Sequence, residues 1–152
     1  MTDNLDIISK IKDLKKQGKV IAFTNGCFDL LHKGHIHLLL QSKKICDHLI
    51  VGLNSDMSIK KIKGDNRPIE NEEKRFKNLV SLGCVDDIII FSETTPLNVI
   101  KDIVPDILIK GRDYKKEEIV GSNVVMKNGG KVILIDLIPN ISTTQLIKEF
   151  DS

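Results

Sequence analysis

The sequence lacks the long apolar run and the large excess of one charge that mark two broad classes of protein. No uninterrupted hydrophobic segment approaches the roughly 20 residues that a membrane-spanning helix needs. Lysine and arginine total 23 and aspartate and glutamate total 21, which leaves a formal net charge of +2. This charge is too small for the basic surface of most nucleic-acid-binding proteins. We therefore expect no membrane and no nucleic acid as partners, and any bound anion should be small.

Cysteine is scarce, and the spacing of the cysteines argues against both a disulfide framework and a zinc site. The three cysteines, Cys27, Cys46 and Cys84, are far apart and form no Cys-x-x-Cys pair. This usage is typical of reduced thiols and predicts neither a disulfide framework nor a zinc site. The first 19 residues contain no compact apolar block with a small-residue cleavage site, so no secretory signal is expected. The sequence predicts a cytoplasmic protein.

Two common nucleotide-binding fingerprints are also missing. The sequence contains no Gly-x-Gly-x-x-Gly after its first predicted strand and no Gly-x-x-x-x-Gly-Lys-Ser/Thr anywhere. The first absence argues against a dinucleotide-dependent dehydrogenase, and the second argues against a Walker-type phosphotransferase.

What the sequence does contain is an alternation of short β-branched runs with helical stretches. Its 152 residues predict a single domain over 1–152, with an N-terminal helix within 1–18 and a core over 19–150. Strands are predicted at 19–24, 49–53, 88–91, 107–109 and 132–135, and helices at 5–17, 35–46, 55–61, 72–82, 96–103, 118–128 and 143–150. Asn71 and Thr95 are the expected N-caps of two helices, with Pro96 at the first helical position. This order predicts a doubly wound α/β fold, with a mainly parallel five-stranded sheet, helices on both faces and ligands at the carboxyl ends of the strands.

The turn after the first predicted strand carries two of the four histidines. His32 and His35 flank Gly34 where a strand gives way to a helix. Free N–H groups and the dipole favour an anion at such a helix start, and imidazoles there can donate hydrogen bonds to phosphoryl oxygens. Half of a metal site and chance placement on a solvated turn are the alternatives, but no further ligand at suitable spacing completes a metal site. We favour phosphate binding.

The helix after this turn carries a lysine in its apolar pattern. Ile36, Leu39, Leu40 and Lys43 fall at positions i, i+3, i+4 and i+7. Because helical side chains lean toward the N-terminus, Lys43 can extend back to the histidines and offer its ammonium to a phosphate. The alternative is that the Lys43 ammonium extends to the edge of the core and reaches solvent, which explains a lysine in the apolar pattern equally well.

A second candidate phosphate site opens the last predicted helix. Ser142 and Gln145 form a capping box, which by itself explains Ser142. Thr143 and Thr144 add hydroxyl donors beside the free N–H groups of the helix, as nucleotide phosphates require. The sequence therefore predicts that two loops at the carboxyl edge of the sheet bind phosphate.

Seven short motifs stand in one order between about residues 19 and 150. They are Asn25-Gly26-Cys27-Phe28-Asp29, His32-x-Gly34-His35, Asn54-Ser55-Asp56, Lys63-Gly64-Asp65-x-Arg67-Pro68, Glu72-x-x-Arg75, Pro105-Asp106-x-Leu108-x-Lys110-Gly111-x-Asp113-Tyr114 and Ser142-Thr143-Thr144. In combination they resemble the cytidylyltransferase-like nucleotidyltransferase superfamily, and within it the D-glycero-β-D-manno-heptose 1-phosphate adenylyltransferases.

The resemblance implies a Rossmann-like sheet, a homodimer and a Mg²⁺-assisted attack by a sugar phosphate on the α-phosphate of a nucleoside triphosphate. A phosphate nucleophile is already anionic, so alignment and charge stabilisation suffice and no general base is required. The resemblance implies catalytic roles for His32, His35 and Lys43. It implies nucleotide binding by Thr24, Asn25, Gly26, Cys27, Phe28, Asp29, Gly34, Arg75, Lys110, Gly111, Ser142, Thr143 and Thr144, and sugar-phosphate binding by Lys63, Arg67 and Asp113. Asp29 would also lie near the metal, and Arg75 would contact the β- or γ-phosphate.

For the substrates, the resemblance implies ATP, heptose 1-phosphate and a product, ADP-heptose, used for lipopolysaccharide or another surface glycan. Asn140-Ile141 is closer to the pattern of glycerol 3-phosphate cytidylyltransferases, so a cytidylyltransferase acting on that or another polyol or sugar phosphate stays open. A catalytically silent nucleotide-binding regulator is the alternative from another class. Arg112 stands where the heptose enzymes commonly have a second glycine. Those enzymes are often joined to a sugar kinase, and 152 residues leave no room for one, so we expect a separate kinase upstream.

Overall fold

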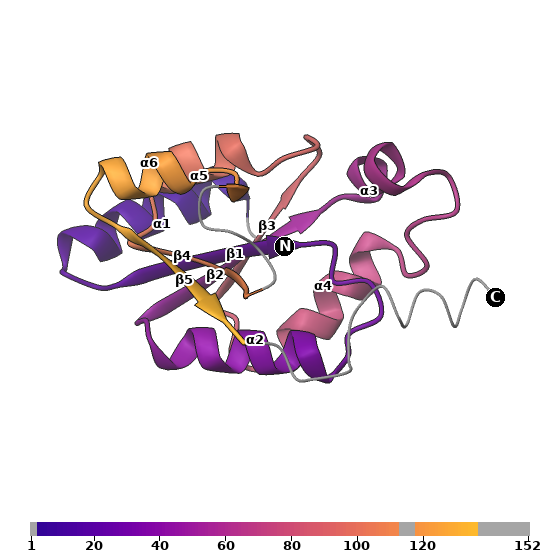
Figure 1. The fold of residues 1–152 in the computed structure, drawn as a ribbon, viewed down its shortest axis with the longest axis horizontal. Helices are drawn as coiled ribbons and strands as arrows, with labels where there is room; N and C mark the ends of the chain where they lie inside the picture. Colours follow the sequence, from indigo (N-terminus) through magenta and orange to yellow (C-terminus); the bar gives the residue numbers. More distant parts are fainter. Residues whose placement is uncertain (1–2, 113–117, 137–152) are drawn as a thin grey trace.

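A single parallel sheet organises the protein. The computed structural model describes residues 3–112 and 118–136. Its strands are β1 (Ile21–Gly26), β2 (His48–Asn54), β3 (Asp87–Phe91), β4 (Ile107–Gly111) and β5 (Lys131–Ile135). They lie in the order β3-β2-β1-β4-β5, and every described pair is parallel (Figure 1). The prediction of a five-stranded, Rossmann-like α/β fold is confirmed.

Helices cover both faces of this sheet, as the sequence predicts. They are α1 (Asn4–Lys16), α2 (Lys33–Lys44), α3 (Asp56–Lys63), α4 (Glu72–Ser81), α5 (Leu97–Ile103) and α6 (Ser122–Lys127). Helices α1, α5 and α6 cover one face, and α2 and α4 cover the other (Figure 1). The helices that the structure describes are too short or too polar to cross a membrane. The helix predicted at 143–150 lies outside the described residues.

The starts of α5 and α6 differ from the prediction in ways that their N-caps explain. Asn71 caps α4 as expected, since its side chain accepts the N–H of Lys74. Pro96 itself holds the N-cap position of α5, however, so Thr95 is not the cap and the helix begins at Leu97. Helix α6 begins four residues later than predicted, at Ser122, because Gly121 takes a left-handed backbone conformation with φ of 88°. Propensity alone did not reveal these two boundaries.

Strand β1 divides the core into two layers because its side chains alternate between the faces of the sheet. Ile21 and Phe23 belong to the apolar cluster that includes residues of α1, α5 and α6. Ala22 belongs to the second cluster, with Leu38 and Leu39 of α2. Both faces are therefore buried, as expected for a parallel sheet covered by helices.

The sheet has its topological switch point between β1 and β4. Strand β2 lies on one side of β1 and β4 on the other, and ligands of doubly wound folds bind outside the carboxyl ends at such a point. Strands β1 and β4 pair only through Ala22 with Ile107 and Phe23 with Leu108. By contrast, β4 pairs with β5 over five positions, from Ile107 to Gly111. The carboxyl ends of β1 and β4 thus extend beyond their shared ladder.

Candidate functional site

The turn from β1 to α2 has an unusual backbone. Phe28 and Leu30 have positive φ angles of 47° and 56°. This left-handed region costs a residue with a side chain about 1–2 kcal/mol, and it persists where surrounding contacts hold it. Asp29, between them, is buried, and its carboxylate accepts the backbone N–H groups of Ile69 at 2.8 Å and Glu70 at 2.9 Å. The strained turn is therefore fixed by the segment that precedes α4.

These bonds give Asp29 a structural role, and the metal role predicted for it stays a prediction. Each of its oxygens accepts a backbone N–H, and the side chain is only 2% exposed, so the carboxylate is committed to holding the turn. Across residues 3–112 and 118–136, no three His, Cys, Asp or Glu side chains are grouped so that they could hold a metal ion. Mg²⁺ prefers oxygen ligands, and the described carboxylates form no cage for it.

The two histidines of the turn lie against each other at the start of α2. Their rings are stacked, with centroids 3.9 Å apart and planes at 24°, and the Phe28 ring lies 5.4 Å from that of His35. His32 caps the helix by accepting the Gly34 N–H at its Nδ1 (3.0 Å), and His35 Nδ1 accepts the His32 N–H (3.4 Å). A neutral imidazole that accepts at Nδ1 carries its proton on Nε2. Each neutral ring therefore has one N–H donor, at Nε2.

Both rings are held in the neutral form at physiological pH. Burial is the main cause that lowers the pKa of His35 to about 3, with smaller contributions from His32 and the positive charge of Lys63. Burial also lowers the pKa of His32. The rings are thus suited to donate hydrogen bonds rather than to act as cations. Their contact with a phosphate stays a prediction.

Two lysines from other elements, Lys110 of β4 and Lys63 of α3, act on the same turn. Lys110, at the end of β4, donates to the carbonyl oxygen of Asn25 at 3.0 Å and so joins the ends of β1 and β4. Burial raises the pKa of the Cys27 thiol, but the charges of Lys63 and Lys110 oppose that shift. The positive charge of Lys63 also contributes to lowering the pKa of His35. The charges of Lys63 and Lys110 therefore act on the histidine turn, and the ligand contacts predicted for these lysines stay predictions.

The phosphate contact predicted for Arg75 does not fit its surroundings in the structure. Its side chain is fully buried, and the guanidinium donates to the carbonyl oxygens of Glu70 (2.9 Å), Cys27 (2.9 Å) and Asn54 (2.7 Å) and to the Asp56 carboxylate (2.7 Å). These bonds direct its donors into the protein rather than toward a β- or γ-phosphate. Arg75 instead ties together the loops that follow β1 and β2.

The position predicted for Lys43 is wrong. Its Nζ donates to Asp86 at 2.7 Å and to the carbonyl oxygen of Asp47 at 2.9 Å. Those partners precede β3 and β2, at the amino edge of the sheet, whereas the histidines lie at the other end of α2. The buried face of α2 contains Leu38 and Ser42, so Lys43 lies beside that face and pairs with a carboxylate.

The remaining predicted residues fall into three groups. Gly26 and Gly111 end β1 and β4, Gly34 is buried in the first turn of α2, and Thr24 is buried within β1. Lys63, the last residue of α3, is exposed, and Arg67 is half-buried in the loop that joins α3 to α4. Ligand contacts by these residues stay predictions. Asp113, Ser142, Thr143 and Thr144 lie outside the described residues.

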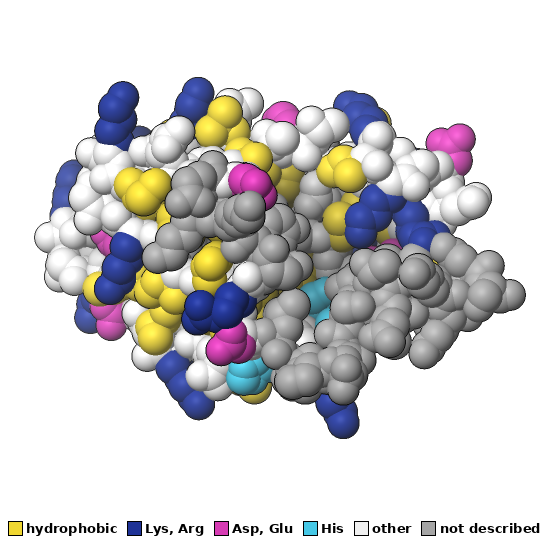
Figure 2. All heavy atoms as spheres, in the orientation of Figure 1, with side chains coloured by type: hydrophobic (Ala, Val, Ile, Leu, Met, Phe, Trp, Pro, Cys, Tyr) yellow, Lys and Arg dark blue, Asp and Glu magenta, His cyan; other side chains and the backbone are white. Residues whose placement is uncertain are grey.

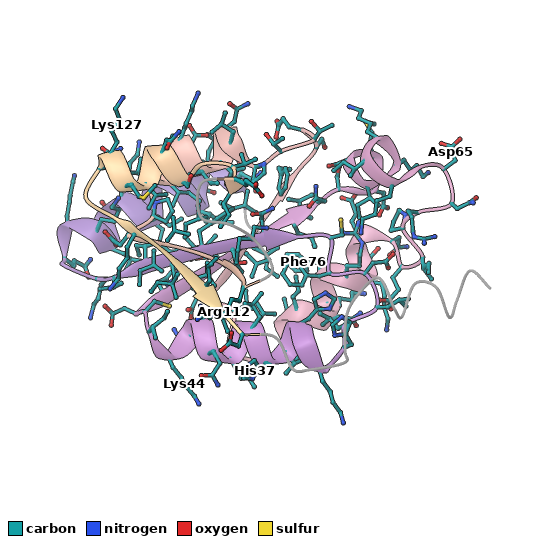
Figure 3. The ribbon with its side chains drawn as sticks, in the orientation of Figure 1. His37, Lys44, Asp65, Phe76, Arg112 and Lys127 are labelled. Carbon is teal, nitrogen blue, oxygen red and sulfur yellow. The ribbon has the colours of Figure 1, made fainter. Side chains whose placement is uncertain are left out.

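Arg112, the departure from the heptose pattern, lies near the carboxyl end of β5 (Figure 3). Its guanidinium pairs with Asp136 and donates to the carbonyl oxygen of Leu134 at 3.2 Å. Its backbone N–H donates to the carbonyl oxygen of Ile135. These contacts join the ends of β4 and β5.

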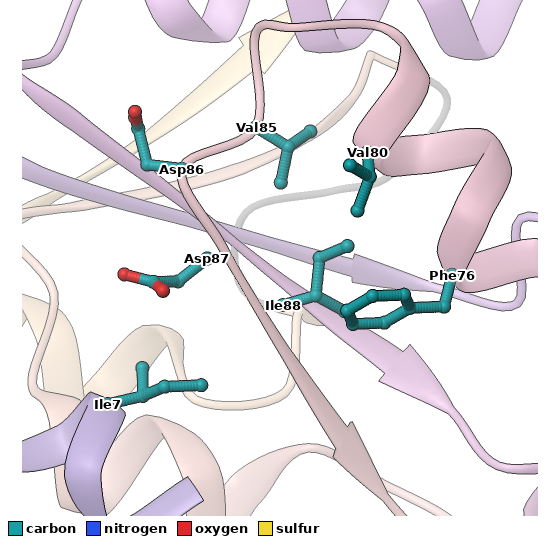
Figure 4. Close-up of a pocket in the computed structure, with 7 residues that line it drawn as sticks. All are labelled: Ile7, Phe76, Val80, Val85, Asp86, Asp87 and Ile88. Atoms are coloured by element: carbon teal, nitrogen blue, oxygen red, sulfur yellow. The ribbon is translucent and has the colours of Figure 1, made fainter. Parts of the chain in front are cut away.

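Other features of the surface lie away from this turn. A pocket of about 190 Å³ lies beside the edge strand β3, at the end of the sheet opposite β5, between Ile7 of α1 and Phe76 and Val80 of α4 (Figure 4). Asp86 and Asp87, which also line it, give it acidic groups unsuited to a phosphate. On the face shown in Figure 2, lysine and arginine side chains are spread over the surface. The histidine turn is thus the best candidate for anion chemistry.

One residue of the site was missed by the sequence analysis. Glu70 accepts the N–H of Leu30 at its Oε1 (3.0 Å), in addition to its backbone bond to Asp29. A glutamate before the N-cap of a helix gives no sequence signal that it will contact a turn some 40 positions earlier in the chain. Only the tertiary structure identifies this contact.

Comparison with known proteins gives matches that span most of the chain. A family model described as Cytidylyltransferase-like matches residues 23–149. The relative named Bifunctional protein HldE from Nitrobacter winogradskyi is 50% identical over 143 residues, which cover 94% of this chain and 29% of that protein. The protein of the same name from Caulobacter vibrioides is 50% identical over 142 residues, covering 93% and 29%. The chain thus spans less than a third of these relatives.

A solved structure is similar as well. It is described as the lipopolysaccharide core biosynthesis protein from Thermoplasma volcanium, and it matches with a TM-score of 0.64 and 31% sequence identity. The match covers 80% of this chain and 98% of that one. Nearly the whole of that protein therefore corresponds to this domain.

Proposed function

The chain belongs to the cytidylyltransferase-like family, and from that premise we propose that it transfers an adenylyl group from ATP to D-glycero-D-manno-heptose 1-phosphate, forming ADP-heptose and pyrophosphate. The choice of substrates is supported by the order of the motifs and by similarity to proteins named Bifunctional protein HldE. A role in surface-glycan synthesis is supported by the similar lipopolysaccharide core biosynthesis protein.

The observation that carries the proposal is the pair of neutral imidazoles at the start of α2. In the proposed reaction, an oxygen of the sugar phosphate attacks the α-phosphorus of ATP. The bond from that phosphorus to the oxygen bridging to the β-phosphate breaks, and pyrophosphate leaves with the electron pair. Negative charge grows on the phosphoryl oxygens, where fixed N–H donors stabilise it most. We assign that task to the Nε2–H groups of His32 and His35 and to the helix N–H groups, and the bonds at Nδ1, which leave the proton of each neutral ring on Nε2, support the assignment.

Two lysines supply the positive charge that the neutral histidines do not. Lys110 is held at the switch point by the carbonyl oxygen of Asn25, and Lys63 is the last residue of α3. We assign Lys110 to the nucleotide phosphates and Lys63, with Arg67, to the sugar phosphate. The acceptor is an anion at neutral pH, so the reaction needs no general base.

We propose that Mg²⁺ enters bound to the triphosphate. The Asp29 carboxylate, which is buried and accepts two backbone N–H groups, supports this assignment because those bonds give it a structural role. Mg²⁺ is commonly held by substrate phosphates and water rather than by a cage of protein oxygens.

The sugar phosphate must come from a preceding phosphorylation, for which we propose a sugar kinase. The word bifunctional in the names of the relatives, which are more than three times the length of this chain, supports a second activity in those proteins. A cytoplasmic location and a homodimer remain part of the same proposal.

A substrate panel tests the proposal. Pyrophosphate release is measured with Mg²⁺ for ATP, CTP, GTP and UTP, each against both anomers of heptose 1-phosphate, glycerol 3-phosphate and other sugar phosphates. The proposal predicts turnover with ATP and a heptose 1-phosphate. Turnover only with CTP and glycerol 3-phosphate would move the protein to the cytidylyltransferases. Nucleotide binding without turnover on any acceptor would support the silent regulator.

A further inference from the structure

Glu70 contacts the strained β1–α2 turn through more than one group. Its backbone N–H donates to Asp29 at 2.9 Å, and its carboxylate accepts the N–H of Leu30 at 3.0 Å. Its carbonyl oxygen accepts a bond from the Arg75 Nε at 2.9 Å. One residue therefore holds two consecutive positions of the turn while it is itself held by a buried guanidinium.

The Glu70 carboxylate is also anchored on α4. The side-chain amide of Asn78 donates toward its two oxygens at 3.3 and 3.4 Å. Asn78 lies within α4, whereas Glu70 precedes the N-cap of that helix, so a helical residue holds the Glu70 carboxylate. Residue Glu70 thus connects α4 to the backbone of Leu30.

The position of Leu30 determines where the histidines begin. Leu30 has a φ of 56° and lies two residues before His32, the N-cap of α2. The His32 N–H in turn donates to the ring of His35. Because the two rings are linked to the backbone and stacked on each other, a displacement of the turn changes the position of both Nε2 atoms. Small displacements of reacting groups are costly to a rate.

We propose that Glu70 is a positioning residue for His32 and His35. Its carboxylate fixes the backbone at Leu30 and thereby sets where the two Nε2–H donors point. This inference rests on the proposed function for its effect on rate. Because Glu70 acts through the turn, it affects kcat more than the KM of either substrate.

Three variants separate positioning from general stability. Glu70→Ala removes the acceptor of the Leu30 N–H, and Glu70→Gln keeps an oxygen in its place. Asn71→Ala is the matched control, because Asn71 is adjacent to Glu70 in the sequence. The substitution removes the N-cap side chain of α4 but no hydrogen bond to the β1–α2 turn. Rates are taken well below each thermal midpoint. Glu70→Ala should lower kcat about tenfold or more with little change in KM, while the other two variants keep most of the wild-type kcat.

A readout without substrate keeps this test independent of the proposed reaction. Amide hydrogen exchange at Leu30 and the ring resonances of His32 and His35 are compared by NMR in the same variants. Glu70→Ala should speed exchange at Leu30 and shift both rings, and Glu70→Gln should restore them. If Glu70→Ala does not fold, Glu70→Asp takes its place, since its shorter side chain draws the carboxylate back from Leu30.

Two results would overturn the inference. One is a Glu70→Ala protein with wild-type kcat and unchanged histidine resonances. The other is an Asn71→Ala protein that loses as much kcat as Glu70→Ala, which would assign the effect to α4 stability. Absence of turnover in the wild-type protein with every substrate pair would contradict the proposed function, and the NMR comparison would still decide the role of Glu70.

Discussion

At the residue scale, the protonation of two rings decides what the site can do. His32 and His35 each accept a backbone N–H at Nδ1, so in the neutral form each has its donor at Nε2. The sequence predicted these residues from their spacing around Gly34, but it carried no information on their protonation. Stacking, burial and the bond partner of each ring are tertiary facts, and they convert a pair of possible cations into two fixed neutral donors.

The first prediction concerns the loss of one donor. His35→Ala should lower kcat by about two orders of magnitude or more, because donors aimed at developing charge act mainly in the transition state. Circular dichroism and a thermal midpoint should show a folded protein. His37→Ala, on the same helix, is the control and should keep most of the turnover. Wild-type turnover in His35→Ala would contradict the role assigned to this ring.

The second prediction concerns acid stability. The pKa of His35 is lowered from 6.5 to about 3 in the folded protein, so between these values the unfolded chain binds more protons. The free energy of unfolding should therefore fall as the pH falls through this window. His35→Gln removes this contribution, and urea titrations between about pH 4 and 6 should show a shallower dependence than wild type. The change should be smaller in His37→Gln, and equal slopes in wild type and His35→Gln would contradict a depressed pKa.

At the element scale, the strands and most helices could be predicted because their apolar runs and caps are local signals. Continuous runs such as Ile88–Phe91 indicate buried parallel strands, and Asn71 signals the start of α4. The contacts between elements could not be predicted. The sequence identifies Lys43 and Arg75 only as cations, and the structure turns one to Asp86 and the other into the protein.

The third prediction concerns the junction that Arg75 makes. Arg75→Met should lower the free energy of unfolding by about 3 kcal/mol or more, because three carbonyl oxygens and the Asp56 carboxylate lose their donor. Lys77→Met is the matched control, since it removes an exposed i,i+4 pair with Glu73 and should change stability by roughly 0.5 kcal/mol or less. Chemical denaturation measures both. Equal effects of the two substitutions would contradict the role of Arg75 as a buried junction.

At the scale of the whole molecule, the strand order explains why distant motifs converge. Strand β1 lies between β2 and β4, and the loops after β1, β2 and β4 therefore end at one edge of the sheet. The fold class and this edge could be predicted from the alternation of strands and helices. The Asp29–Glu70 contact could not, because it depends on how the loop before α4 returns to the β1–α2 turn. The pocket beside β3 has no part in the proposed reaction.

The most direct test of the account follows the oxygen atoms of the acceptor. Heptose 1-phosphate labelled with ¹⁸O at its three non-bridging oxygens is incubated with ATP, Mg²⁺ and the protein, and the products are analysed by ³¹P NMR and mass spectrometry. Attack on the α-phosphorus predicts ADP-heptose that retains all of the label, with one of the labelled oxygens bridging the two phosphorus atoms, and one unlabelled pyrophosphate per product. Release of AMP, label in the pyrophosphate or absence of a sugar nucleotide would contradict adenylyl transfer at the histidine turn.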